Sequence, residues 1–259
     1  MTNTTSAKRL GAGILPMALL GLTVVFCQAA PATSESSAMT QTQTVSETLS
    51  ARQQTIVPIT AFAAAGDISG LSAALHQGLD AGMTVSDARE VLVQVYAYAG
   101  FPRSLNALDE LMKVLETRRQ QGIGDAPGRA PGRPIPKGDA LRSAGAANQT
   151  KLAGAPVKGP LFDFAPAIDE HLKTHMFGDI FERDILDWES REVATVGMLS
   201  ALPGAEAQLQ SHMRISMNAG LTVSQLHQLI QVLAEHVGTD NATRARMALK
   251  QTLAASPTR

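Results

Sequence analysis

Apolar side chains recur at intervals of three and four residues in two stretches of the chain, residues 88–99 and 226–237. This spacing places the apolar side chains on one face of an α-helix, the face that packs against other helices. The pattern therefore predicts two helices with one buried face each. Gly100 and Gly238 stand where these helices are expected to end.

The turns before these two helices also match, at an offset of 138 residues along the chain. They read Ala-Gly-Met-Thr-Val-Ser at residues 81–86 and Ala-Gly-Leu-Thr-Val-Ser at residues 219–224. The glycine suits the left-handed end of a preceding helix, and Thr84 and Thr222 with a polar residue three positions later are typical of a capping box. The repetition predicts a duplicated unit of at least three helices.

The segment between the two units, residues 117–160, has a different composition, with eight glycines, six prolines and eight basic residues. Glycine and proline interrupt helices, so this composition disfavours a packed helix and predicts a long linker or a wrapping loop. The expected organisation is a first unit at residues 45–116, this linker, and a second unit at residues 161–255. Helix is expected again over residues 162–187.

The composition favours a protein built from helices. Of the 259 residues, 44% are apolar, enough for a sizeable core, but only 4% are aromatic. Such a composition favours closely packed helices over a sheet rich in β-branched and aromatic residues. We therefore expect an all-α fold. The formal net charge of −1 gives no sign of a nucleic-acid partner.

The N-terminus has the pattern of a secretory signal peptide, residues 1–32. Lys8 and Arg9 precede an almost wholly apolar run, and residues 30–32 read Ala-Pro-Ala, which suits cleavage. The run is short beside the roughly 20 apolar residues of a membrane-spanning helix, so no membrane association is expected after cleavage. We expect a mature protein that begins near Thr33 and is periplasmic or secreted.

The single cysteine, Cys27, closes this apolar run. A lipid-modified cysteine there would tether the chain to a membrane, but the residue before such a cysteine is normally small, and here it is Phe26. Cleavage after residue 32 removes the cysteine instead. The mature protein then has no disulfide, no thiolate metal ligand and no thiol redox chemistry.

Residues 98–108 read Tyr-Ala-Gly-Phe-Pro-Arg-Ser-Leu-Asn-Ala-Leu and resemble the aromatic-x-Gly-Phe-Pro signature of the carboxymuconolactone decarboxylase family. In the second unit, Ser190-Arg191-Glu192 before an apolar helix, followed by His212, resembles the core of the same family. The resemblance implies the helical fold shared with alkylhydroperoxidase AhpD proteins, usually assembled as trimers or hexamers. It implies chemistry without a cofactor.

The peroxidase branch of this superfamily resembles the chain only in part. There, a glutamate works with a Cys-x-x-Cys pair whose second cysteine precedes a histidine by four residues. With Glu192 and His212 in the glutamate and histidine places, the cysteines would fall near Ala205 and Gln208. Neither side chain forms a thiolate, so thiol peroxidase activity is not expected.

Glu192 and His212 are the candidate catalytic pair. A lactone decarboxylation needs charge accepted beside the departing carboxylate and a proton delivered to carbon, which suits a histidine oriented by a carboxylate. The alternative is a polar pair that only holds two helices together. The first unit has Gln53 and Ala74 at the equivalent positions, so we interpret it as a degenerate copy kept for packing or as one wall of a pocket.

Arg191, Tyr98 and His236 are the candidate substrate-binding residues. Arg191 and its counterpart Arg52 precede apolar helices and suit an anionic carboxylate, although a structural ion pair near a helix start explains them equally well. Tyr98 belongs to the family-like motif, and His236 stands at the equivalent place in the second unit. Either side chain lines a pocket or serves packing alone.

His171 and His175 stand four residues apart beside acidic residues, a spacing that metal ligands on a helix share. The chain has no His-Glu-x-x-His motif, and we expect no metal site.

Two functional hypotheses follow. One is a cofactor-free enzyme that decarboxylates or processes the lactone of a small anionic substrate, with His212 and Glu192 as the acid–base pair. The other is a non-catalytic binding or assembly scaffold, favoured by the signal peptide, because aromatic catabolism by this family is usually cytoplasmic. A closed pocket with His212, Glu192 and an arginine favours the enzyme.

Overall fold

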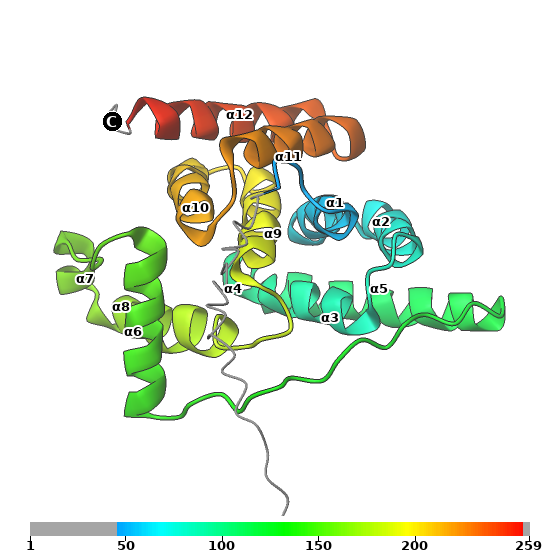
Figure 1. The fold of residues 1–259 in the computed structure, drawn as a ribbon, viewed down its shortest axis with the longest axis horizontal. Helices are drawn as coiled ribbons and strands as arrows, with labels where there is room; N and C mark the ends of the chain where they lie inside the picture. Colours follow the sequence, from blue (N-terminus) through cyan, green and yellow to red (C-terminus); the bar gives the residue numbers. More distant parts are fainter. Residues whose placement is uncertain (1–45, 256–259) are drawn as a thin grey trace, which may run out of the picture. The chain divides into compact units, whose positions relative to one another are not determined.

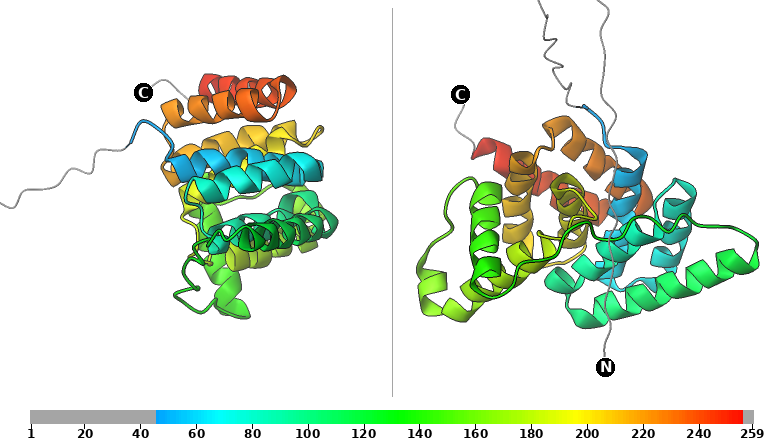
Figure 2. Two further views of the ribbon diagram at one scale, coloured as in Figure 1. Left: turned by 90° about the vertical axis from the view of Figure 1, so that its right-hand side faces the viewer. Right: turned by 60° about the horizontal axis from the view of Figure 1, so that its bottom comes forward.

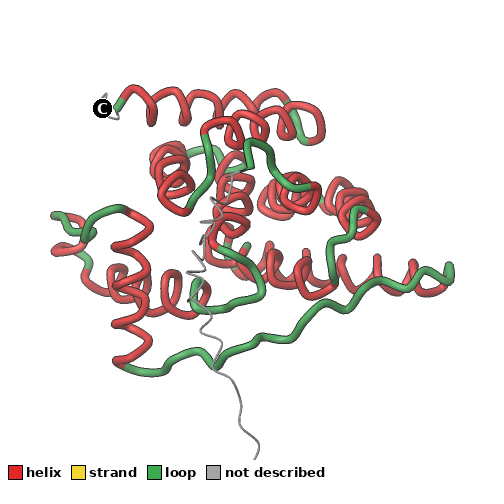
Figure 3. The backbone as a smooth tube through the Cα atoms, in the orientation of Figure 1, coloured by secondary structure: helices red, strands yellow, loops and turns green. Residues whose placement is uncertain are grey.

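The computed structural model describes residues 46–255, and every regular element in that range is a helix. Figure 3 shows only helices and loops there, without a strand, and the all-α prediction is confirmed. The predicted signal peptide, residues 1–32, and Cys27 lie outside the described residues. No helix among the described residues has the length and apolar character needed to cross a membrane.

The helices fall into three groups along the chain (Figure 1). The first group is α1 (Ala51–Ala65), α2 (Ile68–Asp80), α3 (Val85–Gln94), α4 (Tyr96–Ala99) and α5 (Phe101–Gln120). The middle group is α6 (Asp139–Ala153), α7 (Pro160–Phe164), α8 (Pro166–His171) and the π-helix η1 (Leu172–Ile180). The last group is α9 (Trp188–Ser200), α10 (Glu206–Ala219), α11 (Val223–His236) and α12 (Thr239–Ala254).

α3 in the first group and α11 in the last begin in the same way. Thr84 and Thr222 each form the expected capping box, in which the threonine hydroxyl accepts a hydrogen bond of 3.1 Å from the main-chain N–H three residues later. Glycines with positive φ also recur at the 138-residue offset, at Gly66 and Gly204, Gly82 and Gly220, and Gly100 and Gly238. This parallel is what a duplication would produce, and the duplication itself stays a prediction.

The buried faces of α3 and α11 are those that the spacing of apolar residues predicts. Val91, Leu92 and Val95 are fully buried in the first group, as are Leu226 and Leu229 in the last. The first of the two helices is not continuous, however. It is interrupted at Val95, and the short helix α4 carries the chain on to the positive-φ residue after Ala99.

The first and last groups share one hydrophobic core, with α9 at its centre. α1 packs along α9, and α10, α12 and α4 contact it on other sides (Figure 1). The close approach of α1 depends on Gly197, because a Cβ atom there would lie 2.3 Å from Thr60 Oγ1. The left view of Figure 2 shows the resulting layers, with α11 and α12 above α1 and α2, and α5 below them.

Residues 117–160 are only partly a loop. α5 continues to Gln120, and residues 121–138 run without helix along the lower edge of Figure 1. α6 then packs against η1, so the prediction of a linker is wrong for residues 139–153. The composition of the whole segment concealed this helix, because residues 139–153 hold no proline and only one glycine, Gly145.

The loop at residues 121–138 is fixed to the helices it crosses. The main-chain N–H groups of Val85 and Ser86 donate to the carbonyl oxygens of residues 126 and 127, at 2.9 and 3.1 Å. Further along, Asp184 accepts from the main-chain N–H of Gly132 at 3.0 Å and pairs with Arg129 at 3.1 Å. The loop therefore has defined partners and positions the start of α6.

Helix resumes near residue 160 as expected, but in three short pieces, and residues 181–187 are loop rather than helix. The last piece, η1, is a π-helix, a form that is rare and is often found at functional sites.

Gly145 provides a test of the packing of α6. A Cβ atom at this residue would lie 1.7 Å from the main-chain oxygen of Lys173 in η1. We expect Gly145→Ala to lower the free energy of unfolding by about 2 kcal/mol, because backbone cannot move aside as a side chain can. Urea denaturation measures the change. Gly124→Ala is the control, since nothing lies within 4 Å of a Cβ atom there, and equal effects of the two variants would contradict the packed helix.

Candidate functional site

Glu192 on α9 and His212 on α10 lie in direct contact. His212 Nδ1 is 2.8 Å from Glu192 Oε2. The side chain of Glu192 is fully buried, and the side chain of His212 is 11% exposed to solvent. The contact between the two candidate catalytic residues, which sequence by itself does not reveal, is thus present.

Local sequence sets the position of each partner. Asp187 caps α9 by accepting a hydrogen bond of 2.7 Å from the main-chain N–H of Ser190, which places Glu192 in the second turn. A short turn after α9 returns the chain so that α10 packs against it. The main-chain oxygen of His212 accepts a hydrogen bond of 2.7 Å from the hydroxyl of Ser216, one turn later.

The contact with Glu192 determines how the imidazole is oriented. This contact with Glu192 occupies Nδ1 of His212. Nε2 is then the ring nitrogen that can exchange a proton with a ligand. Such an arrangement, a histidine held by a buried acid, is typical of acid–base sites.

His212 lines a cavity of about 720 Å³. Its other walls come from α6, α7, α8, η1 and α12, the elements around α10. The lining is mainly apolar, and Arg214 is the one cationic side chain among the lining residues that the structure describes. The volume lies within the range of pockets that take small molecules.

Tyr98 comes from the first group of helices and packs edge-on against the imidazole of His212, with 5.5 Å between ring centroids. Its hydroxyl is buried and has no hydrogen-bond partner among the described residues. Burial, together with the negative charge of Glu192, raises the pKa of the Tyr98 phenol well above its usual range. Tyr98 is therefore a neutral wall behind the histidine and is not among the residues lining the cavity.

A comparison with known families identifies the part of the chain that holds the pair. Residues 166–251 match the domain of the carboxymuconolactone decarboxylase family. This domain extends from the start of α8 into α12 and contains Glu192 and His212. A search of curated proteins finds no match to the chain. The resemblance is thus confirmed within the second unit, and for residues 45–116 it stays a prediction.

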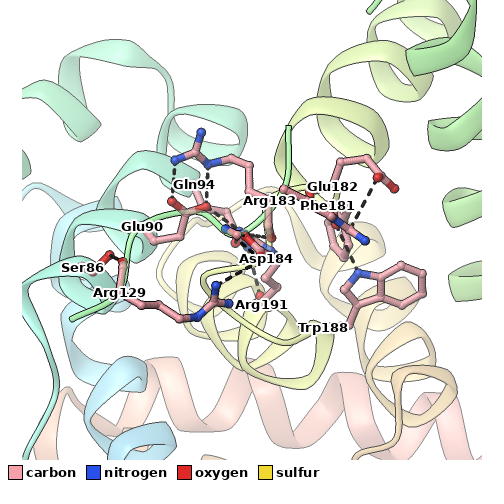
Figure 4. Close-up of polar contacts among 12 residues, drawn as sticks. Ser86, Glu90, Gln94, Arg129, Phe181, Glu182, Arg183, Asp184, Trp188 and Arg191 are labelled. Atoms are coloured by element: carbon pink, nitrogen blue, oxygen red, sulfur yellow. Dashed lines mark hydrogen bonds and ion pairs between the residues drawn. The ribbon is translucent and has the colours of Figure 1, made fainter. Parts of the chain in front are cut away.

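Arg191 does not face the cavity of the family domain. It is fully buried, donates to Glu90 Oε1 at 2.8 Å and to the main-chain oxygen of Arg183 at 2.7 Å, and also bonds Gln94 (Figure 4). Consecutive residues on a helix point about 100° apart, so Arg191 and Glu192 face different neighbours. These contacts favour the structural ion pair, the alternative reading of Arg191, over a role in substrate binding.

His236 also lies away from His212. It is exposed and borders a separate hollow of about 230 Å³ between α1, α2 and α11. His236 therefore does not line the cavity at His212. Arg52, the counterpart of Arg191, forms ion pairs of 3.1 Å with Asp87 and 3.4 Å with Asp187 and has a structural role.

His171 and His175, the two histidines of the middle helices, are not part of a cluster of metal-ligating side chains among the described residues. No group of three or more metal-ligating side chains gathers anywhere in residues 46–255. His175 instead contacts the hydroxyl of Tyr96 and lies 3.7 Å from Asp179.

Sequence reasoning missed the residues that complete the cavity. Arg214 lies two residues after His212, and its guanidinium donates to the main-chain oxygen of Thr252 at 3.1 Å. Gln149, Leu161 and Phe162 fall within or just beyond the segment taken for a linker. The position of Arg214, two residues after the candidate His212 on the same helix, was the one feature of the sequence that could have indicated a substrate-binding arginine.

The ion pairs of Glu90 give a testable pH dependence. Burial alone raises the pKa of Glu90, but hydrogen bonds and charges from Arg183 and Arg191 outweigh it and hold the pKa below its ordinary value of 4.5. The ionised carboxylate therefore stabilises the fold above about pH 4.5, and this contribution is lost as the pH falls through the lowered pKa.

We expect Glu90→Gln to lower the free energy of unfolding by about 3 kcal/mol at pH 7, because it leaves two arginines without their carboxylate. The difference from the wild type should shrink as the pH falls below 4.5. Chemical denaturation between pH 3 and 7 measures both effects. Glu235→Gln, at an exposed residue of α11, is the control, and a difference independent of pH would count against the assignment.

Tyr98 provides a second stability test. Tyr98→Phe removes a buried hydroxyl without a hydrogen-bond partner, so we expect the free energy of unfolding to rise by about 1 kcal/mol. Thermal or urea denaturation measures the change. Tyr96→Phe is the matched control, because the hydroxyl of Tyr96 contacts His175 and its removal offers no such gain. A loss of stability in Tyr98→Phe would show that the hydroxyl does have a partner.

Proposed function

We propose that the cavity at His212 is the active site of a cofactor-free enzyme that decarboxylates, or processes the lactone of, a small anionic substrate. The observation that carries the proposal is the 2.8 Å contact between His212, in the wall of a cavity, and the fully buried Glu192. A histidine that only joined two helices would not need an open cavity beside it. The family domain at residues 166–251 supports the same reaction class.

In this proposal His212 carries the proton. When the carbon–carbon bond to a carboxylate breaks, CO₂ leaves and its bonding electrons pass to the neighbouring carbon and its conjugated carbonyl. Nε2 of protonated His212 then donates a proton to that carbon, and solvent returns a proton to the ring. Glu192 orients the imidazole and stabilises its positive charge, as a buried carboxylate does for a catalytic histidine.

Arg214 takes the role that sequence reasoning gave to Arg191. Its positive charge in the cavity lining suits the carboxylate of an anionic substrate. A thiol peroxidase reaction is not proposed, because the chain has a single cysteine, Cys27, and no Cys-x-x-Cys pair. Gln208, near one of the expected cysteine positions, lines the cavity with an amide instead.

The alternative of an assembly scaffold has one observation in its favour. Phe101, Leu105 and Met112 share one side of α5 and are 60–69% exposed. Exposed apolar side chains of this kind favour association with another chain. We propose a homo-oligomer, a trimer or hexamer by the family resemblance, in which the enzyme site and such an interface coexist. We also propose that the predicted signal peptide directs this protein out of the cytoplasm.

The acid–base role of His212 can be tested by turnover of carboxymuconolactone-type lactones, in forms that carry one and two carboxylates. We expect His212→Ala to lower kcat at least about 100-fold, because a positioned acid–base group contributes a factor of that size or more. Glu192→Gln keeps the shape but not the charge and should lower kcat by a smaller factor. CO₂ release measures the rate. His227→Ala, at an exposed histidine on α11, is the control, and equal rates for wild type and His212→Ala would refute the proposal.

A further inference from the structure

We infer that the cavity at His212 binds monocarboxylic acids with a medium-length alkyl or aryl body, in preference to compact polycarboxylates. This inference rests on the proposed function, because it narrows the substrate class of the same site to acids with one carboxylate next to a conjugated carbonyl and an apolar body. The saturated acids used below report the binding preference alone. It is carried by three features of the cavity: its apolar walls, the charges in its lining and the origin of those walls in the chain.

The walls opposite α10 are apolar. They include Leu161 and Phe162 of α7, Ile168 of α8, and Leu172 and Phe177 of η1. With a volume of about 720 Å³, the cavity has room for more than a small lactone. Apolar ligand groups gain free energy when they leave water for such walls, whereas a carboxylate placed there loses its hydration without a partner.

The charges in the lining suit one anionic group. Arg214 is the one cation among the lining residues that the structure describes, and no aspartate or glutamate accompanies it there. Arg214 and His212 both belong to α10, so the charged and proton-transferring groups come from one helix. A ligand with one carboxylate directed to α10 and an apolar body against α7, α8 and η1 satisfies both sides.

Part of the apolar wall lies outside the family domain. Leu161 and Phe162, like Val157 before them, precede residue 166, where the family match begins. α7 packs against α8, and α6 is bonded to η1, where Asn148 donates to the main-chain oxygen of Phe177 at 2.9 Å. The apolar wall is therefore built partly by residues inside the family match and partly by residues before it.

A second copy of the chain is the competing occupant. Leu161 and Phe164 on α7 are 64% and 88% exposed, which would also suit an interface. The cavity, however, reaches His212, a buried residue that contacts Glu192. An interface between two copies of the chain does not need a cavity that reaches a buried histidine. We therefore commit to the small acid, and the second copy is an outcome of the test.

The experiment measures binding to the full chain by titration calorimetry. The probes are straight-chain monocarboxylates of four, six, eight and ten carbons, with adipate as the compact dicarboxylate and octan-1-ol as the neutral analogue. We expect affinity to rise about fourfold for each added methylene group until the cavity is filled. Octanoate should bind at least tenfold more tightly than adipate, and also more tightly than octan-1-ol.

Two exposed apolar residues provide matched variants. Leu161→Asp places a charge in the cavity wall, and we expect it to weaken octanoate binding at least tenfold. Met247→Asp, at a residue of α12 that is 57% exposed and not part of the lining, should leave binding unchanged. Both side chains are exposed, so neither substitution is expected to prevent folding. Circular dichroism and sedimentation of each variant verify its fold and mass.

Three results would overturn the inference. They are an affinity that does not depend on chain length, adipate binding as tightly as octanoate, and equal effects of Leu161→Asp and Met247→Asp. If Leu161→Asp lowers the sedimentation mass while octanoate does not bind, the face is an interface between copies and the inference is likewise refuted. The calorimetric experiment measures binding and not turnover. If wild type and His212→Ala turn over substrate at equal rates, the catalytic proposal fails, but the measured preference for monocarboxylates still stands or falls by itself.

Discussion

The burial of α9 from its third residue onward is the constraint on which the rest of this structure depends. Every residue from 190 to 200 is buried, including the adjacent charged pair Arg191 and Glu192. A buried charge without a partner costs several kcal/mol, so the helices around α9 must supply partners. α3 supplies Glu90 to Arg191, and α10 supplies His212 to Glu192.

The two partnerships have different consequences for function. The one around Arg191 is closed, because Glu90, Gln94 and the main chain of the 181–187 loop take up its guanidinium (Figure 4). The one around Glu192 is open on one side, because His212 reaches from the buried carboxylate to a cavity. The need for polar partners inside the core thus produces a structural cluster on one face of α9 and a candidate site on another.

The middle helices convert that open side into a pocket. Without α6, α7, α8 and η1, His212 would border only α10 and α12 among the elements that line the cavity. These helices reach their place because the loop at residues 121–138 is bonded to α3 and to Asp184, and because Gly145 lets α6 approach η1 closely. The family domain holds the histidine and the acid, while part of the surface that a ligand meets comes from outside it.

The sequence by itself determined the helical class, the buried faces, the capping boxes at Thr84 and Thr222 and the candidate pair of Glu192 and His212. These features are local or rest on a short family-like pattern, and local spacing is enough to express them. Only the tertiary structure decided which neighbour each charge meets. Arg191 and Arg214 each lie close in sequence to a candidate catalytic residue. Arg191 is bonded to Glu90 of α3, whereas Arg214 lines the cavity. The packing of the helices decides which neighbour each side chain meets.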